Sequence, residues 1–167
     1  MRMKLKKMNF RWLAALALTA TLSPTDACTG ITLKSKDQAT IVARTIEWGG
    51  TNLNSQYVIV PRRYTDRSLT PDGKDGMRFQ SRYGYVGLAV EMKEFIAEGI
   101  NEAGLSAGLF YFPNYGQYEA YQPDKKACSM ADLQLVPYIL GECATLEEVK
   151  AAVERIHIIN IDPRAST

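Results

Sequence analysis

The hydrophobic residues change their spacing part-way along the chain, and this change constrains the fold more than any other feature. Six short β-type runs come first, at residues 29–35, 39–46, 56–61, 83–92, 94–100 and 105–112. From Ser129 the spacing becomes helical, with Leu133, Val136 and Leu140 on one stripe. Strands followed by helices are typical of an α+β protein or a layered sandwich, so this is the fold class that we expect.

Two helices are expected in the second part of the chain. Gly141 is a typical C-terminal stop for the first helix, and Pro137 inside it predicts either a kink or a late start. Thr145 is followed three residues later by Glu148, which fits a capping box that opens the second helix. A strand is expected to begin within residues 158–161. The polar stretch 62–75 predicts a loop or an extended excursion.

Residues 1–27 have the order of a secretory signal. A basic start is followed by an apolar stretch from Trp12 to Leu22 and by a small-residue segment that ends at Ala27. The apolar stretch is about half of the ~20 residues that a membrane-spanning helix needs. We therefore expect a signal peptide that is removed after Ala27, and export to the bacterial periplasm or the extracellular space. Residues 28–167 are enough for one domain with its own core.

The charge of the chain argues against nucleic acid as a partner. The net charge is +2, but residues 1–27 hold five basic residues and one acidic residue, so residues 28–167 carry −2. No basic face for nucleic acid is therefore expected. No stable membrane span is expected once the signal is removed, and self-association into a homo-oligomer stays open.

Three cysteines and a single histidine limit the chemistry of the chain. Cys128 and Cys143 either form a disulfide, which an oxidising compartment permits, or are two small buried hydrophobic residues. His157 lies in the apolar run 156–159, which is typical of a satisfied core or edge histidine. Cysteine and histidine have no metal-site spacing, so neither a metal nor another cofactor is expected.

Cys28 becomes the first residue of the chain if the signal is removed after Ala27. The thiolate is the nucleophilic form of cysteine, and a free thiol with a pKa of about 8.5 is little ionised at neutral pH. An α-amine has a pKa of about 7.7–8.0, so it can accept a proton in this range. An N-terminal cysteine therefore carries a nucleophile and a general base on one residue.

A β-hairpin is expected directly after Cys28. If Ser35 and Ala39 close its turn, Cys28 faces Ile46, and two further pairs follow along the strands: Gly30 with Arg44, and Thr32 with Val42. Four apolar residues then share the opposite face and are expected to supply core: Ile31, Leu33, Ile41 and Ala43.

Two charged residues come close to Cys28 in this register. Arg44 is expected to stand beside the thiol, where its positive charge favours the thiolate form. Glu47 is expected either to orient the amine or to pair with Arg44. The alternative for both is an ordinary charged pair at a strand end. An aromatic run, Phe110-Tyr111-Phe112-Pro113, follows later and forms either a loop over a pocket or a cap on the sheet edge.

Two stretches resemble the choloylglycine hydrolase family. One is Cys-Thr-Gly-Ile-Thr-Leu at 28–33 with Ala-Arg-Thr-Ile-Glu-Trp at 43–48, because family members open with Cys-Thr and carry Arg-x-Met-Asp at the same distance. The other is Glu-Gly-Ile-Asn-Glu-Ala-Gly-Leu at 98–105, which looks like the family's Asp-Gly-Met-Asn-Glu-x-Gly-Leu turn. The family contains bile salt hydrolases and penicillin V acylases, which are N-terminal nucleophile hydrolases. The resemblance extends over residues 28–160.

The resemblance implies a four-layer αββα sandwich, of which this chain holds about the first half. It implies that Cys28 is the nucleophile and α-amino base, and that Arg44 is the arginine beside it. Glu47 takes the place of the family's aspartate, which keeps the carboxylate and lengthens its reach. The family's substrate-loop position falls near Phe110 or Tyr111. Phe110 matches neither the asparagine of many bile salt hydrolases nor the tyrosine of penicillin V acylases.

The activity implied by the resemblance is hydrolysis of a non-peptide linear amide C–N bond in a small molecule. Conjugated bile salts are the leading substrates, with penicillin V and N-acyl homoserine lactones as alternatives. Family members are longer than this chain, and their oxyanion-stabilising asparagine and second arginine lie beyond it. Loss of one oxyanion donor typically costs about 10²–10³ in rate. We therefore expect a truncated fragment that carries the nucleophile and lacks activity alone.

Two hypotheses from other classes stay open. A cysteine after a signal peptide is also what lipid attachment requires, which would make the chain a lipid-anchored, non-enzymatic exported module. Thr25-Asp26-Ala27 is a poor lipobox, because an apolar residue is usual three positions before the cysteine. The third hypothesis is an inactive exported fragment.

Overall fold

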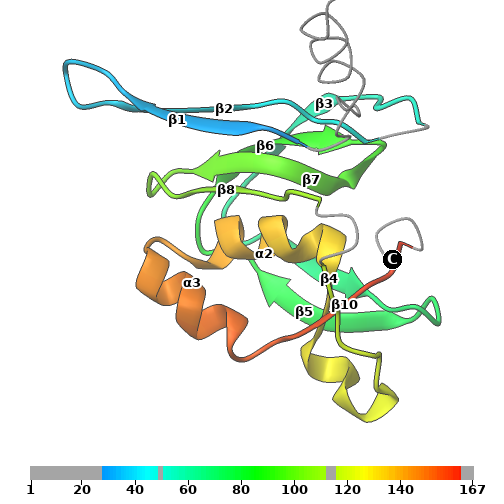
Figure 1. Cartoon of the computed structure of the whole chain (residues 1–167). Helices are drawn as coiled ribbons and strands as arrows, with labels where there is room; N and C mark the ends of the chain where they lie inside the picture. The colour runs from blue at the N-terminus through cyan, green and yellow to red at the C-terminus, as the bar shows by residue number, and fades with distance from the viewer. Residues whose placement is uncertain (1–27, 49–50, 112–115, 163–167) are drawn as a thin grey trace, which may run out of the picture.

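A four-stranded antiparallel sheet lies at the centre of the molecule, in the order β3-β6-β7-β8 (Figure 1). The computed structural model describes residues 28–48, 51–111 and 116–162. The strands of the sheet are β3 (Gln56–Val60), β6 (Tyr85–Val90), β7 (Met92–Asn101) and β8 (Ser106–Gly108). The runs predicted at 56–61, 83–92 and 94–100 are confirmed, whereas the strand predicted at 105–112 is shorter than expected.

Different elements cover the two faces of this sheet (Figure 1). A hairpin of β1 (Gly30–Lys34) and β2 (Thr40–Arg44) lies over one face, and helix α2 (Leu135–Glu142) lies across the other. The core between sheet and helix is a cluster of buried side chains: Val60, Tyr85, Ala89, Ile96, Val136 and Leu140. On its far side α2 packs against a second hairpin, where Phe79 and Tyr138 meet edge to face at 5.5 Å. The helix therefore lies between two β layers.

The first hairpin has the predicted register. Gly30 pairs with Arg44 and Thr32 pairs with Val42, and the Ser35 amide donates to the Ala39 carbonyl at 3.0 Å to close the turn. This alternation points Arg44 toward the central sheet, so the neighbouring residues of β2 point away from it.

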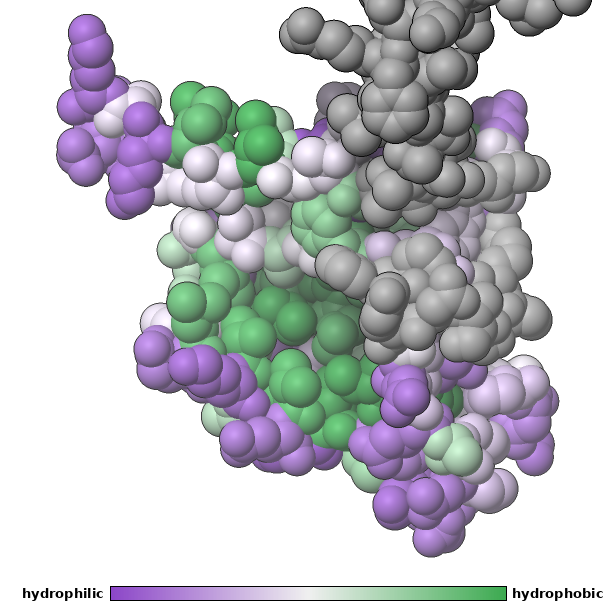
Figure 2. Space-filling view, viewed as in Figure 1, coloured by the Kyte–Doolittle hydropathy of each residue, from purple (hydrophilic) through white to green (hydrophobic). Residues whose placement is uncertain are grey.

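The prediction that the opposite face of this hairpin supplies core is wrong. Ile31, Leu33 and Ile41 are 52%, 54% and 51% exposed, and Ala43 is exposed as well. Figure 2 shows apolar side chains on the surface of the hairpin behind its polar tip. The physical reason is that no element in the described part of the chain packs over this face.

The stretch 62–75 was predicted to be a loop or an extended excursion, and most of it belongs to a hairpin of β4 (Thr65–Leu69) and β5 (Asp75–Gln80). The hydrophobic signal is missing because polar residues take the buried positions of β4. Ser68 is fully buried, and its Oγ accepts the Ala131 amide at 2.6 Å. Thr70 follows the strand, and its Oγ1 accepts the Lys74 amide at 3.1 Å.

Helix α2 begins later than the helical spacing suggested. Residues 123–134 form η1 (Pro123–Cys128), β9 (Ser129–Ala131) and η2 (Asp132–Gln134), so the helix predicted to begin at Ser129 starts at Leu135. Pro137 lies in the first turn of α2, which confirms the late start. Gly141 lies inside the helix rather than after it. Its missing side chain matters for packing, because a Cβ there would be 2.9 Å from Ser81 Oγ.

The second helix, α3 (Leu146–Val153), has the predicted N-terminal cap. The Glu148 amide donates to Thr145 Oγ1 at 3.2 Å. The Glu148 carboxylate reaches back to the Ala144 amide at 2.7 Å, one residue before the cap itself. Both donors at the start of the helix are therefore satisfied by side chains.

The chain then forms β10 (His157–Ile159), which pairs in parallel with β9. His157 is buried, with Nδ1 2.6 Å from Glu119 Oε2 and Nε2 3.1 Å from the Ala120 carbonyl. This confirms the prediction of a satisfied histidine. Cys128 and Cys143 are both free thiols, so the disulfide alternative is wrong, and burial raises the pKa of the Cys143 thiol. None of the helices in the described ranges has the length and apolar character needed to cross a membrane.

Candidate active site

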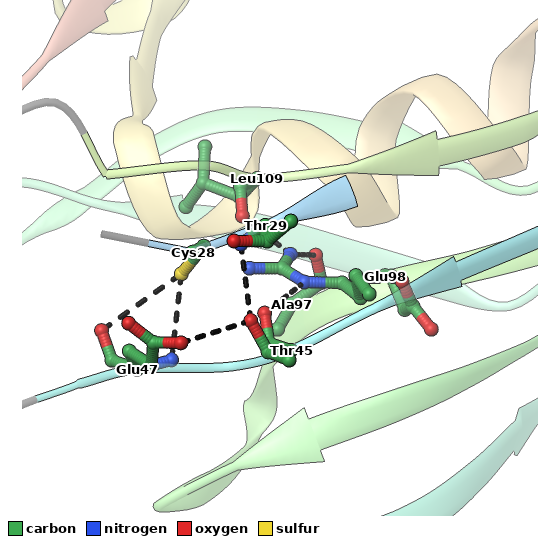
Figure 3. A network of polar contacts seen from close by, with 8 residues as sticks. Cys28, Thr29, Thr45, Glu47, Ala97, Glu98 and Leu109 are labelled. Atoms are coloured by element: carbon green, nitrogen blue, oxygen red, sulfur yellow. Dashed lines mark hydrogen bonds and ion pairs between the residues drawn. The ribbon is translucent and has the colours of Figure 1, made fainter. Parts of the chain in front are cut away.

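Cys28 lies just before β1, and its sulfur rests against the backbone of Glu47 (Figure 3). The Glu47 amide donates to Cys28 Sγ at 3.5 Å, and the thiol is 3.8 Å from the Glu47 carbonyl. The backbone of Glu47 thus offers the sulfur one donor and one acceptor, which hold it in place.

Thr45 connects the residue after Cys28 with the side chain of Glu47. The Thr29 amide donates to Thr45 Oγ1 at 3.0 Å, and the Thr45 hydroxyl lies 3.1 Å from Glu47 Oε1. The sequence reasoning missed Thr45, although it stands between the two charged residues that were singled out. A β-branched polar residue in a strand carries no signal of its own.

Arg44 fastens the hairpin to the central sheet. Its side chain is only 3% exposed, and Nη1 donates to the Leu109 carbonyl at 2.5 Å and to the Ala97 carbonyl at 3.3 Å. The predicted pairing of Glu47 with Arg44 is wrong, since the acidic partner of Arg44 is Glu98 on β7, at 4.0 Å. The guanidinium reaches inward to the sheet, whereas Thr45 holds the Glu47 carboxylate.

Phe110 covers the guanidinium of Arg44. The ring centroid is 4.3 Å from the Arg44 Cζ atom, within the range of a cation–π contact. The ring also approaches Gly30, where a Cβ would be 2.7 Å from Phe110 Cζ. Glycine at position 30 therefore lets the aromatic ring reach the arginine, and the predicted substrate residue Phe110 also holds a charged neighbour in place.

These residues line a pocket with an empty volume of about 470 Å³, part of which is open to solvent. The aromatic run at residues 110–113 was expected to form either a loop over a pocket or a cap on the sheet edge. Phe110 and Tyr111 line the pocket, which favours the first alternative for these two residues. Phe112 and Pro113 lie outside the described residues. Trp48 meets Tyr111 edge to face at 5.4 Å. The walls are largely apolar and include Ile46, Val90, Phe95, Ala97, Leu109 and Leu133.

Asp132 is a polar member of the pocket lining that the sequence did not reveal. It is almost fully buried, and burial raises the pKa of its carboxyl. Oδ1 accepts the Leu133 amide at 2.9 Å, and Oδ2 accepts Asn160 Nδ2 at 2.8 Å. The carboxyl thus ties η2 to the end of the described chain beside the pocket. Within the described residues, no three side chains of His, Cys, Asp and Glu come together as a metal site.

Asn101, in the motif at residues 98–105, has a structural role outside the pocket lining. Asn101 is buried, and its Nδ2 donates to the carbonyls of Leu140 and Cys143 at 2.9 and 2.7 Å. Its Oδ1 accepts the amides of Ala103 and Leu105 at 3.1 and 3.0 Å. This asparagine therefore shapes the turn after β7 and caps the end of α2, away from Cys28.

A family model described as linear amide C–N hydrolases, choloylglycine hydrolase family, matches residues 28–166. The chain belongs to this family. The predicted family is thereby confirmed, and the members of this family are described as amide hydrolases. The predicted fold class of an N-terminal nucleophile hydrolase is also confirmed by the solved structures that the chain resembles.

Relatives and solved structures agree with the family match. The chain is 24% identical over 137 residues to a bile salt hydrolase/transferase of Lactiplantibacillus plantarum, covering 81% of the chain and 39% of the relative. It is 25% identical to a bile salt hydrolase/transferase of Clostridium perfringens, covering 80% and 40%. The structure of penicillin V acylase from Agrobacterium tumefaciens is similar with a TM-score of 0.64 and 22% identity, covering 82% and 40%. The chain thus spans about two fifths of the length of these relatives.

Proposed function

We propose that Cys28, freed as the N-terminal residue by removal of residues 1–27, is the nucleophile of an exported hydrolase of linear amides. The observation that carries the proposal is the position of Cys28 Sγ, held by the Glu47 backbone at the rim of an apolar pocket. The family match begins at Cys28, which supports the same starting residue. Export to the periplasm or the extracellular space is part of the proposal and rests on residues 1–27.

The chemistry follows from one residue that holds both nucleophile and base. The thiol proton passes to the α-amine, and the sulfur bonds to the amide carbonyl carbon. The C–N bond then breaks as the α-ammonium returns a proton to the departing nitrogen. Water attacks the resulting thioester, which releases the carboxylic acid and restores the thiol. Arg44 keeps a positive charge on the pocket wall during these steps, held by two backbone carbonyls.

Conjugated bile salts are the proposed substrates, because the walls beside Cys28 are apolar and two relatives carry that activity in their names. A bulky apolar acyl group buries surface there, and polar atoms at the rim face the amide. Penicillin V is the second candidate. It is favoured by the aromatic side chains of Trp48, Phe110 and Tyr111 in the pocket lining, which suit a small aromatic acyl group, and by the acylase whose fold the chain shares. N-acyl homoserine lactones remain a third substrate class of the proposal.

We further place residues 28–167 as the nucleophile-bearing part of the catalytic unit, with turnover dependent on groups outside it. This part of the proposal predicts a separation between acylation and turnover. An activated aryl ester needs little help at its leaving group, so it should acylate Cys28 in the chain alone. A conjugated bile salt has a poor leaving amine, so its hydrolysis should need the complete constellation.

The experiment uses residues 28–167 and the p-nitrophenyl ester of an apolar acid as the probe. Mass spectrometry of peptides then measures the acyl group on each thiol. Cys128 is a partly exposed thiol and serves as the internal control, whereas Cys143 is buried. We expect acylation at Cys28 at least about tenfold faster than at Cys128, as for a thiol activated by its surroundings. Equal rates at the two thiols would overturn the proposed nucleophile.

Two further measurements separate the alternatives. Glycocholate and penicillin V, offered to the same chain, should show which acyl group slows the labelling of Cys28 by occupying the pocket. An intact mass that includes a diacylglyceryl group on Cys28 in the exported protein would support the lipid-anchored module and exclude the enzyme, because lipid attachment consumes the thiol.

A further inference from the structure

Thr45 lies at the centre of a hydrogen-bond network beside Cys28 (Figure 3). The Thr29 amide, the Thr45 hydroxyl and the Glu47 carboxylate follow one another at 3.0 and 3.1 Å. A backbone hydrogen bond from the Thr45 amide to the Thr29 carbonyl, at 2.9 Å, joins the same two segments of the chain. The hydroxyl is therefore held between a backbone amide and a carboxylate.

The hydrogen bonds of this network can run in only one direction. A backbone N–H can only donate, so Thr45 Oγ1 must accept from Thr29. A hydroxyl has a single hydrogen, which leaves it to donate to Glu47 Oε1. Glu47 Oε1 is then the acceptor of this hydrogen bond. The threonine thus fixes the place of the Glu47 side chain.

Glu47 meets Cys28 twice, through different parts of the same residue. Its backbone amide and carbonyl hold the sulfur, and its side chain is drawn by Thr45 toward Thr29, the residue that follows Cys28. Without Thr45 the side chain would be free to swing into solvent, because Glu47 is exposed and Arg44 is bound to other partners.

We propose that Thr45 is a positioning residue that holds the Glu47 carboxylate as counter-ion for the α-ammonium of Cys28. This role rests on the proposed function, since it needs Cys28 to be the first residue. An anion held beside an ammonium favours its charged form, so the α-amine titrates at a higher pH than it would without Glu47. Thr45 therefore sets the pH range in which the amine is free to act as a base.

The test measures the titration of the α-amine in the chain that starts at Cys28. With the thiols first alkylated by iodoacetamide, acetylation of the amine by acetic anhydride, followed across pH by peptide mass spectrometry, gives the midpoint. Thr45→Val removes the hydroxyl and keeps the β-branched shape, and it should lower the midpoint by about half a pH unit, as for loss of an ion pair open to solvent. Thr45→Ser keeps the hydroxyl and should stay within about 0.2 units of the unchanged chain.

The Glu47→Gln background separates positioning from a purely structural role. Glu47→Gln alone should lower the midpoint as much as Thr45→Val, and the double variant should lower it no further, because both changes remove one interaction. Additive shifts would overturn the proposal, as would a midpoint that is the same with valine at position 45. If Cys28 still reacts faster than Cys128 in that case, the proposed nucleophile stands and only the role of Thr45 fails.

Discussion

Replacement of Arg44 by methionine tests how the hairpin that carries Cys28 is held on the sheet. The side chain is nearly fully buried, donates to the carbonyls of Ala97 and Leu109, and lies under the ring of Phe110. Ala97 O also accepts the Leu109 amide, so Leu109 O is the carbonyl most dependent on the arginine. Hydrogen bonds from a charged donor are worth about 1.5–3 kcal/mol and a cation–π contact about 0.5–2 kcal/mol.

Methionine recovers part of the apolar contact, so the net loss in the free energy of unfolding should be about 3 kcal/mol. Equilibrium urea unfolding of residues 28–167 measures this loss, and hydrogen exchange should show faster exchange of the backbone amides in β1 and β2. Arg44→Lys keeps the charge and loses the planar guanidinium, so its free energy of unfolding should lie between that of the unchanged chain and that of Arg44→Met. Arg67→Met is the matched control, because Arg67 is exposed, pairs with Asp75 on the surface and should lose less than about 1 kcal/mol. If Arg44→Met and Arg67→Met unfold at the same urea concentration, the arginine is no anchor and the reasoning is refuted.

Three other changes test the scaffold around the site. Asn101→Ala should cost about 3 kcal/mol in urea unfolding, because it leaves buried amides and carbonyls without their partner, and a loss under about 1 kcal/mol would contradict that role. Thr145→Ala should cost about 1 kcal/mol by removing the cap of α3, whereas Thr145→Ser should be close to neutral. The Thr70 hydroxyl and Lys74 lower the pKa of Asp72 to about 2 from 3.8, so between these values the folded chain binds fewer protons than the unfolded one. Stability from this group is present above pH 3.8 and is lost as the pH falls through 2. The midpoint temperature of thermal unfolding should therefore fall less over this range for Asp72→Asn than for the unchanged chain. An identical fall for both would contradict the assignment.

The first hairpin and its register could be predicted because alternation in a strand fixes which residues share a face. Gly30 and Arg44 pair as expected, and the same pattern brought Arg44 toward the sheet. Strand β4 could not be predicted, because Ser68 satisfies its hydroxyl through the Ala131 amide and so occupies a buried position that normally holds an apolar residue. A polar side chain with a distant backbone partner leaves no periodic signal.

The residues singled out in the sequence come together in the structure, but Thr45 and Asp132 and most of the contacts could not be predicted. Cys28, Arg44, Phe110 and Tyr111 line one pocket, as does Glu47. The partners of Arg44 are backbone carbonyls, which every residue carries, so no sequence pattern could name them. The expected pairing of the two charges failed for the same reason.

The apolar face of the first hairpin shows a different limit. Its residues alternate as a buried face does, and three of them are more than half exposed in the described chain. Alternation reports that a face is built for packing, and it does not report what packs there. The relatives are more than twice as long as the part that matches, which is consistent with a face built for a larger unit.

The most direct test of the central claim compares two forms of the chain that differ by one residue. One form starts at Cys28 and the other keeps Ala27 in front of it, so every side chain of the pocket is the same and only the second form lacks a free amine on Cys28. The measurement is the rate of acylation at Cys28 with the p-nitrophenyl ester, read by mass spectrometry of peptides at neutral pH. The account predicts fast acylation of the form that starts at Cys28, and a rate close to that of Cys128 when Ala27 is retained. Equal rates at Cys28 in both forms would contradict it, because the α-amine would then play no part in activating the thiol.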